Sequence, residues 1–307
     1  MLNTELFNKI LMEPAQRPEI NRLRIVSGFA TAGLADRHLK KLSELQRPIS
    51  VELMVGMTSY SGIQEAQHLA LKTLVQSPPD NINFACRYVE QGPPVHAKAF
   101  CWFSEERPIS AFIGSANYTQ MGFSTQQVEA MTKTDAGLVS NFQNDIFART
   151  VSCLESGISS RISLIQTSIV PVNDQNSVNL SLLVRKTGET PDRSGINWGQ
   201  REGRQRNQAY INIPAKVNRQ GFFPDIGERF TVITDDNRSF VMVRAQDGGK
   251  GLETTYNNSE IGEYLRARLN LNSGEYVTRQ HLNAYGRTDV TFTKIDDETY
   301  FMDFSKN

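Results

Sequence analysis

The chain has 307 residues, of which 39% are hydrophobic and 21% charged, a composition typical of globular proteins and long enough for two domains. No run of 18 apolar residues occurs, and the N-terminus lacks a basic start followed by an apolar stretch, so a transmembrane helix and a secretion signal are excluded and a cytoplasmic location is expected. Lysines and arginines balance the carboxylates at 33 each, so any binding of nucleic acid must depend on a local concentration of charge.

The first half of the chain alternates short apolar runs with amphipathic segments of helical length. Strands alternating with helices favour an α/β fold, here a mixed sheet flanked by helices. We predict strands at residues 24–30, 49–56, 83–89, 97–103, 111–114 and 128–132, and helices at 33–45, 63–75 and 141–154.

Beyond about residue 180 short strands dominate, separated by turn signals. This pattern predicts a β-rich domain, a barrel or pseudobarrel. We place the domains at 1–175 and 176–307, with a linker near 171–174. Strands are predicted at 210–213, 229–234, 240–245, 290–295 and 300–304, and helices at 260–271 and 278–284.

The three cysteines, Cys86, Cys101 and Cys153, are odd in number and lack CxxC spacing. We therefore expect structural thiols in a reducing compartment, with neither a disulfide framework nor a zinc site.

Two segments carry the chemistry: VHAKAFCWF at 95–103 and FIGSANYT at 112–119. On a strand, His96 and Lys98 would project from one face. A cation beside an imidazole forms a pocket for phosphate and keeps the imidazole neutral and nucleophilic. Ser115, Asn117 and free backbone N–H groups of the following turn are further donors to phosphate oxygens. A lone HxK is a weak signal, but HxK followed by an apolar strand and GSxN is specific.

These two motifs resemble those of the phospholipase D superfamily, and the match covers His96, Lys98, Gly114, Ser115 and Asn117. The chain departs from the pattern at the aspartate expected five residues after the lysine, where Phe103 stands. Glu105 and Glu106 lie nearby, but nothing in the sequence says that they substitute. In the nuclease branch a glutamate after GSxN orients the histidine, and Glu129 is the candidate for this role.

The resemblance implies a mechanism that needs two such motifs, whereas this chain has one. His38, His68 and His281 lie in no HxK context, so we expect structural or surface roles for them. The second motif would come from a second chain, which implies a homodimer with a composite site at its interface. One histidine would form a covalent phosphohistidine, and lysines and asparagines would neutralise the phosphorane, so no cofactor or divalent metal is expected.

The stretch 185–219 holds eight basic and three acidic residues, a local excess of five. Its SGINWGQ segment resembles the DNA-binding half of NgoFVII- and BfiI-type restriction endonucleases, which is similar to plant B3 domains: an open seven-stranded barrel that grips the major groove with two arms. Side chains of this first arm suit base edges and phosphates, although Trp198 would serve equally as a core anchor. The candidates are Arg193, Ser194, Asn197, Trp198, Gln200, Arg201 and Arg204.

The same resemblance implies a second arm at 246–258, where glycines would let the backbone approach DNA closely. Its candidate contacts are Lys250 to phosphate, and Thr254, Thr255 and Asn257 to bases.

Together these features predict a type II site-specific deoxyribonuclease that needs no metal. The resemblance further implies a cognate methyltransferase and, in some relatives, a separate ATP-dependent helicase-type subunit. A sequence-specific DNA-binding protein with an inert phospholipase D-like half remains the alternative, because the aspartate is missing. A lipid phosphotransferase is a weaker rival, since the arginine-rich arm would have no use there.

Overall fold

The computed structural model describes residues 2–124, 127–166 and 176–306. The chain divides into two compact units, Met1–Thr167 and Ser168–Asn307, which are described separately below. The predicted linker at 171–174 lies outside the described residues, next to the domain boundary predicted after residue 175.

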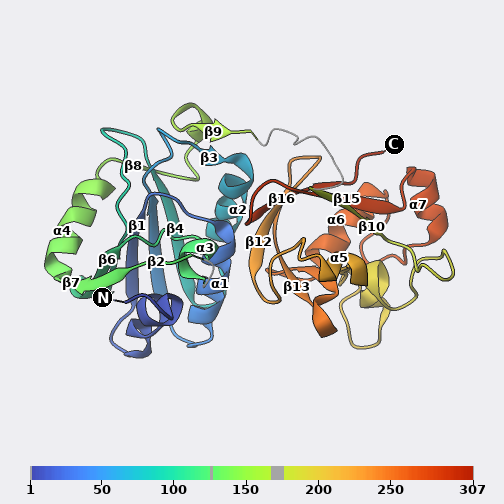
Figure 1. The fold of residues 1–307 in the computed structure, drawn as a ribbon, viewed down its shortest axis with the longest axis horizontal. Coiled ribbons are helices and arrows are strands. Elements are labelled where there is room, and N and C mark those ends of the chain that lie inside the picture. The colour runs from blue at the N-terminus through green and yellow to red at the C-terminus, as the bar shows by residue number, and fades with distance from the viewer. Residues whose placement is uncertain (1, 125–126, 167–175, 307) are drawn as a thin grey trace. The chain divides into compact units, whose positions relative to one another are not determined.

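The first unit is built on a seven-stranded sheet with strand order β7-β6-β5-β1-β2-β4-β8 (Figure 1). The strands β1, β2 and β4 run parallel, whereas β5, β6, β7 and β8 join them in antiparallel pairs. The predicted mixed sheet is therefore confirmed. Its strands are β1 (Arg22–Ser27), β2 (Ile49–Val55), β4 (Ile82–Val89), β5 (Ala99–Ser104), β6 (Arg107–Gly114), β7 (Met131–Thr134) and β8 (Thr150–Ser152).

Helices cover both faces of this sheet. α4 packs on one face, and Val139 and Ile146 of this helix join the buried core that it shares with β1 and β5. α1 and α2 lie on the opposite face (Figure 1). The helices are α1 (Ala32–Ser43), α2 (Glu65–Gln76), α3 (Gln120–Phe123) and α4 (Ala136–Phe147), with shorter turns at Phe7–Met12, Pro14–Gln16 and Ile158–Ser160 and a small sheet of β3 (Ile63–Gln64) and β9 (Leu164–Ile165).

Two predicted boundaries were wrong in ways that matter for the site. The strand predicted at 97–103 begins only at Ala99, so His96 and Lys98 lie in the irregular segment that leads into β5. The helix predicted at 141–154 begins at Ala136, because Asp135 caps it by accepting a hydrogen bond from the Leu138 amide at 2.8 Å. It ends at Phe147, and β8 follows.

The second unit contains another seven-stranded sheet, in the order β10-β15-β16-β12-β13-β14-β11. All neighbouring pairs are antiparallel except β12 with β16. The two edge strands, β10 and β11, approach each other, which nearly closes the sheet and confirms the predicted pseudobarrel. The strands are β10 (Ser177–Ser181), β11 (Ile211–Asn212), β12 (Arg229–Thr234), β13 (Ser239–Ala245), β14 (Gly251–Thr254), β15 (Asp289–Lys294) and β16 (Thr299–Asp303).

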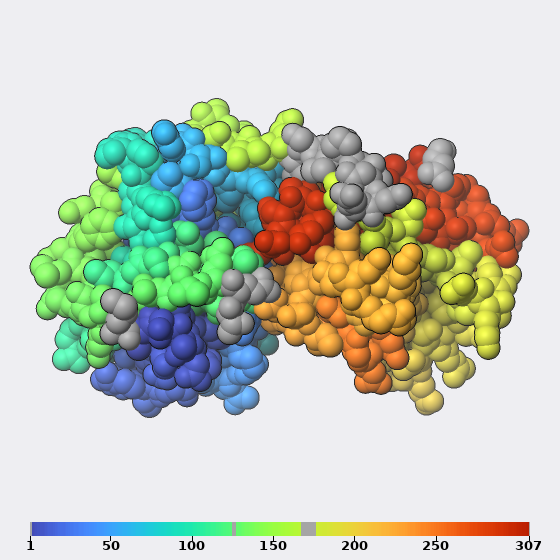
Figure 2. Space-filling view, viewed as in Figure 1, coloured from blue at the N-terminus to red at the C-terminus, as the bar shows by residue number. Residues whose placement is uncertain are grey.

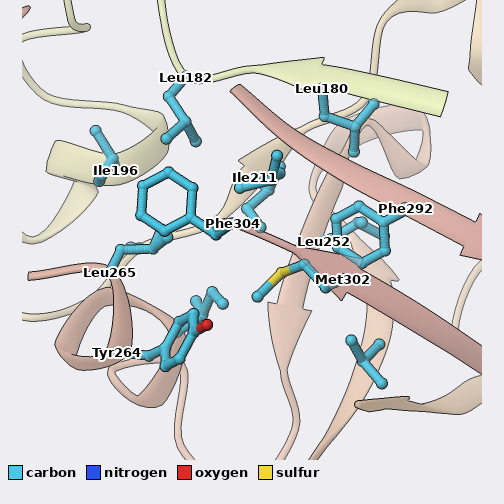
Figure 3. Packing of buried hydrophobic residues seen from close by; sticks show 14 of the residues in the cluster. Leu180, Leu182, Ile196, Ile211, Leu252, Tyr264, Leu265, Phe292, Met302 and Phe304 are labelled. Carbon is cyan, nitrogen blue, oxygen red and sulfur yellow. The ribbon is translucent and has the colours of Figure 1, made fainter. Parts of the chain in front are cut away.

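The interior of this second sheet is filled by alternating apolar side chains from its strands. Figure 3 shows Leu180, Leu252, Phe292 and Met302 meeting there, and Tyr264 of α6 packing at one end. The helices of this unit are α5 (Ala215–Arg219), α6 (Glu260–Arg268) and α7 (Arg279–Tyr285).

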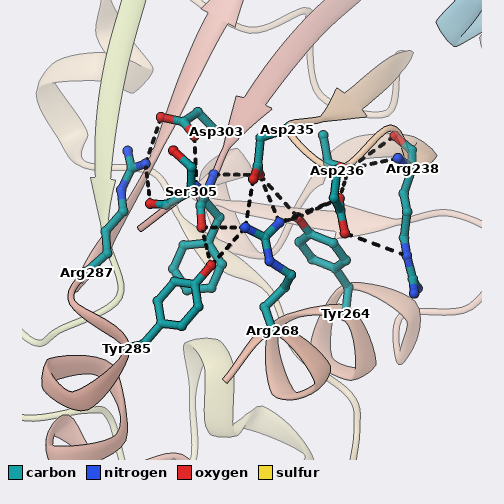
Figure 4. Close-up of polar contacts among 11 residues, drawn as sticks. Asp235, Asp236, Arg238, Tyr264, Arg268, Tyr285, Arg287, Asp303 and Ser305 are labelled. Carbon is teal, nitrogen blue, oxygen red and sulfur yellow. Dashed lines mark hydrogen bonds and ion pairs between the residues drawn. The ribbon is translucent and has the colours of Figure 1, made fainter. Parts of the chain in front are cut away.

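A polar network braces the end of this barrel (Figure 4). The Arg268 guanidinium forms an ion pair with Asp235 at 2.7 Å and donates to the Tyr285 hydroxyl and to the Phe304 carbonyl. One side chain thereby joins α6, α7, the turn after β12 and the segment after β16.

Within the described ranges, no helix combines the length and the apolar character needed to cross a lipid bilayer.

Candidate functional site

The predicted catalytic residues His96 and Asn117 come together at the end of β1. A Cβ atom placed on Gly28 would lie 2.7 Å from His96 Cδ2 and 3.4 Å from Asn117 Oδ1. Only glycine fits between these two side chains, so Gly28 is part of the site although it belongs to neither motif.

Two neighbours of Gly28 hold the site in place. The Asn117 side-chain oxygen accepts hydrogen bonds from the Phe29 amide at 3.2 Å and from the Ser27 hydroxyl at 3.4 Å. The ring of Phe29 meets the His96 imidazole edge-on, with 5.8 Å between centroids. With Asn117 Oδ1 occupied in this way, the Asn117 amide nitrogen is the part of this side chain left to donate hydrogen bonds among the described residues.

The sequence analysis did not identify Ser27, Gly28 or Phe29. The signal available was a pair of small residues, Ser27 and Gly28, at the end of a buried strand, where the carboxyl ends of parallel strands meet.

Lys98 is largely buried, with 8% of its surface exposed, and its ammonium group donates to the His96 carbonyl at 2.7 Å. This bond fixes the segment that carries the imidazole. Burial lowers the pKa of Lys98, while the nearby Glu129 carboxylate raises it.

Ser115 and Glu129 form a second contact across the strand ends. The Ser115 hydroxyl donates to the Glu129 carboxylate and accepts a hydrogen bond from the Ala130 amide at 3.0 Å. The hydrogen-bond partner of Glu129 in this structure is therefore Ser115, and no hydrogen bond joins Glu129 to His96. The proposed orienting role of Glu129 stays a prediction.

Phe103 occupies the position where the phospholipase D pattern has aspartate, and its ring is fully buried in β5. The Arg22 guanidinium lies 4.5 Å from the centre of this ring and forms an ion pair with Glu106. The Glu105 amide donates to the Asn21 side chain. Nothing in these contacts brings Glu105 or Glu106 to the histidine.

A mostly apolar pocket of about 690 Å³ opens beside Lys98. It lies between the ends of β5, β6 and β7 and helix α4, where Leu138 is 70% exposed. Its other lining residues include Ile113, Met131 and Phe142. Exposed apolar side chains therefore lie next to the predicted catalytic lysine.

The remaining histidines have structural contacts. His38 is buried between the Tyr118 hydroxyl and the Leu11 carbonyl, and burial lowers its pKa to about 4. His68 contacts the Tyr88 hydroxyl at 2.9 Å, and its pKa is likewise lowered to about 4 by burial. His281 completes a capping box with Thr278 at the start of α7.

The first predicted arm is split between the interior and the surface of the second unit. Asn197 is fully buried, and its amide bonds to Pro191 and Val277, so this side chain braces the arm from within. Trp198 is also buried, and its ring packs edge-on against Tyr210. The Arg204 guanidinium carbon lies over this ring, 3.8 Å from its centroid. Ser194 precedes the 3₁₀ turn Gly195–Gln200, and Gln200 bonds to the Gly274 carbonyl.

The arginines of this arm face solvent. Arg193, Arg201 and Arg204 are exposed, and the Arg201 side chain donates to the Arg193 carbonyl at 2.7 Å. The segment around residue 200, yellow in Figure 2, lies at the surface of its unit.

The second predicted arm combines a glycine turn with a strand. Lys250 and Asn257 are exposed, whereas Thr254 belongs to β14 and is 3% exposed, with its hydroxyl bonded to the Asn257 carbonyl. The Thr255 hydroxyl donates to the Val241 carbonyl.

Buried Arg244 holds this glycine turn. Its guanidinium donates to the carbonyls of Gly249 and Pro224 and to the Asn218 side chain. Arg244 thereby ties the turn to α5, a contact that the sequence analysis did not anticipate.

Three solved structures are similar to parts of this chain at low identity. Nuc from Salmonella typhimurium, titled a phospholipase D family member, is 17% identical over 43% of this chain and 81% of its own, with a TM-score of 0.33. NucT from Helicobacter pylori is 13% identical over 49% of this chain and 96% of its own, at 0.34. A polyphosphate kinase from Porphyromonas gingivalis is 15% identical over 46% of this chain and 20% of its own, at 0.34. None of the curated proteins matches the chain.

Two family descriptions match the chain and together span most of it. Residues 4–160 match the NgoFVII restriction endonuclease N-terminal PLD domain, which is more than half of the chain. Residues 171–296 match the NgoFVII C-terminal B3-like DNA-binding domain. Both matches agree with the two observed folds, and the first also covers His96 of the HxK motif and Asn117 of the GSxN motif, which meet at Gly28. The chain belongs to the NgoFVII restriction endonuclease family, with a phospholipase D-like nuclease domain followed by a B3-like DNA-binding domain.

Proposed function

We propose that this protein is a type II-like site-specific deoxyribonuclease that hydrolyses double-stranded DNA without a divalent metal. The observation that carries the proposal is the convergence of His96 and Asn117 at Gly28, with the Lys98 ammonium bonded beneath the same segment. A nucleophile and an amide donor that meet at one point, with a cation bonded to the backbone of the nucleophile, suit a tetrahedral phosphate.

In the proposed reaction the neutral His96 imidazole attacks phosphorus. A nitrogen–phosphorus bond forms, the bond from phosphorus to the leaving oxygen breaks, and that oxygen takes a proton from the imidazolium of a second His96. Water then attacks the phosphohistidine while the second His96, which has given up its proton, takes a proton from this water; the nitrogen–phosphorus bond breaks, which frees the first imidazole and leaves a 5′- or 3′-phosphate on the cut end. Lys98 and Asn117 balance the growing negative charge, the work that a metal ion does elsewhere.

The second imidazole requires a homodimer, because the chain has one HxK motif. We propose that a second copy covers the apolar pocket beside Lys98. Leu138, Phe142 and Ile113 are exposed there, and covering them would bury apolar surface next to the catalytic lysine. A composite site would then form at the edge of this contact.

Site selection belongs to the C-terminal unit in this proposal. The exposed cations of the two arms would hold the DNA backbone, and polar side chains between them would reach base edges. A cognate methyltransferase would protect the host's own sites, and an ATP-dependent helicase-type subunit would be an accessory to cleavage.

The test is cleavage of high-complexity genomic DNA in excess EDTA. Wild-type protein is expected to give discrete fragments, and His96→Ala is expected to give none while retaining its gel-shift binding to the same DNA. His281→Gln is the matched control: glutamine preserves the capping box of α7, so cleavage should be unchanged. Cleavage by His96→Ala would contradict the assignment of the nucleophile.

The second candidate function is a DNA reader with an inert nuclease half. The buried Phe103 at the expected aspartate position favours it. Sequence-specific binding by the wild-type protein, with no cleavage under any metal or nucleotide condition, would support this alternative.

A further inference from the structure

Strand β11 lies between the two predicted arms and is bonded to both. The Tyr210 amide, just before the strand, donates to the Gly195 carbonyl of the first arm at 3.1 Å. The Ile213 amide, just after it, donates to the Lys250 carbonyl of the second arm at 2.8 Å. These two bonds hold the backbone of β11 in place, and with it any side chain that projects outward from this strand.

Asn212 is that side chain. Its neighbours Ile211 and Ile213 are 1% and 4% exposed and point into the barrel core, whereas Asn212 alternates with them and is exposed. Among the described residues its amide forms no hydrogen bond. This contrasts with Asn197, whose amide is saturated inside the same domain.

Glycines border Asn212 on both sides. In the ladder, Asn212 pairs with Gly251 of β14. On the first-arm side, a Cβ placed on Gly195 would lie 3.1 Å from Asn212 Nδ2. The Tyr210 ring, on the same face of the chain, covers Gly251, where a Cβ would lie 2.9 Å from the ring. Both glycines are buried, so the backbone on either side of Asn212 is closely packed, and the Asn212 side chain is the exposed polar group at this point between the two arms.

The charges near Asn212 indicate which kind of molecule would bind there. The exposed cations of the arms, Arg193, Arg201, Arg204 and Lys250, form no ion pair with a carboxylate in the described part of the chain. Elsewhere in the unit arginines are neutralised, as Arg268 is by Asp235 and Arg287 by Asp303. Unneutralised cations around an unbonded amide fit a polyanion that also carries hydrogen-bonding edges, which is duplex DNA.

We propose that Asn212 is a specificity-determining residue that reads one base pair from the strand between the arms. A carboxamide forms paired hydrogen bonds with the N6 and N7 edge of adenine in the major groove, so the recognised site should contain an adenine that depends on Asn212. This inference rests on the proposed function, since it requires that the C-terminal unit select a DNA sequence.

The experiment is selection of bound duplexes from a random-sequence library, carried out in EDTA with the full-length His96→Ala protein so that bound DNA stays intact. This parent protein should yield a defined consensus. Addition of Asn212→Ala should abolish the preference for adenine at one position, with roughly tenfold or greater loss of discrimination there, and leave the other positions unchanged. Affinity for non-specific DNA should not change, because no phosphate contact is removed.

Asn283→Ala is the matched control, because Asn283 is an exposed asparagine on α7 of the same unit. It should leave the consensus intact. Asn212→Asp keeps the shape of the side chain but removes its donor, and it should lose the same single preference. A consensus unchanged at every position in both Asn212 variants would overturn the inference. A parent protein that selects no sequence at all would instead overturn the proposed function of the C-terminal unit, so the two failures are distinguishable.

Discussion

At the scale of single residues, the candidate site combines residues of the two motifs with Gly28, which belongs to neither motif. His96, Lys98, Ser115 and Asn117 were predicted because their motif spacing is itself the signal. Gly28 was not, since its importance arises from a close approach between the end of β1 and two motifs distant in the chain. Such contacts exist only in the folded structure. The bond from Ser115 to Glu129 likewise joins two residues that the sequence analysis named separately, and the orienting role of Glu129 stays a prediction.

The charge on Lys98 gives a prediction at this scale. Burial lowers its pKa and Glu129 raises it, so the lysine loses its proton, and with it phosphate binding, as pH rises through its folded pKa. Glu129→Gln removes the raising influence. We therefore expect the alkaline limb of the pH–cleavage profile to move to lower pH in this variant. Such a shift is distinct from a fall in rate that is the same at every pH.

Glu44→Gln, at the residue that follows α1, controls for a general change of charge, because Glu44 is exposed and forms an ion pair with Lys41. An alkaline limb at the same pH in Glu129→Gln and in wild-type protein would show that the two groups are not coupled during catalysis.

At the level of elements, prediction succeeded where a segment's own pattern determines its structure. The strand expected at 229–234 is β12, at those residues, because residues 230–234 form an unbroken run of aromatic and β-branched side chains. β10 and β14 were missed, since a polar segment and a glycine-rich segment become strands only through the partners that they pair with. α5 was missed because five residues give too little periodicity to detect.

The second arm provides the prediction at this scale. Arg244 binds the glycine turn of this arm to α5 through three acceptors, so Arg244→Met should release the turn while keeping the aliphatic bulk of the side chain. We expect specific DNA affinity, measured by gel shift, to fall by about tenfold or more, as one ordered contact surface is lost.

Arg238→Met is the comparison variant, because Arg238 lies at the solvent-exposed turn before β13 and its ion pair with Asp236 is long, at 3.9 Å. Thermal unfolding of both variants should be recorded alongside. Full affinity in Arg244→Met would mean that the arm keeps its conformation without this guanidinium.

For the whole molecule, the proposed composite site predicts how activity falls when wild-type and inactive chains are mixed. Activity should follow the square of the wild-type fraction of chains. If each cleavage centre needs one His96 from each of two chains, then mixed dimers with a His96→Ala chain are inactive. After equal amounts of wild-type and variant chains are co-refolded, roughly one quarter of wild-type dimer activity should remain.

Co-refolding with His281→Gln serves as the control, and activity should then stay near its full value. Retention of half the activity in the His96→Ala mixture would indicate that each chain cuts alone, which would argue against a shared centre.

The strand order of the two sheets also has a consequence during translation. Every strand of the first sheet has been synthesised once the ribosome has passed Ser152. In the second sheet β10 can pair only after β15 has been synthesised, and the hydroxyls of Ser177 and Thr293, which meet across this pair, are 116 residues apart in sequence. The nuclease domain can thus assemble on the ribosome well before the DNA-binding domain. A requirement for two chains at each cleavage centre would keep such a half-made nascent polypeptide from attacking the chromosome of the cell that is producing it.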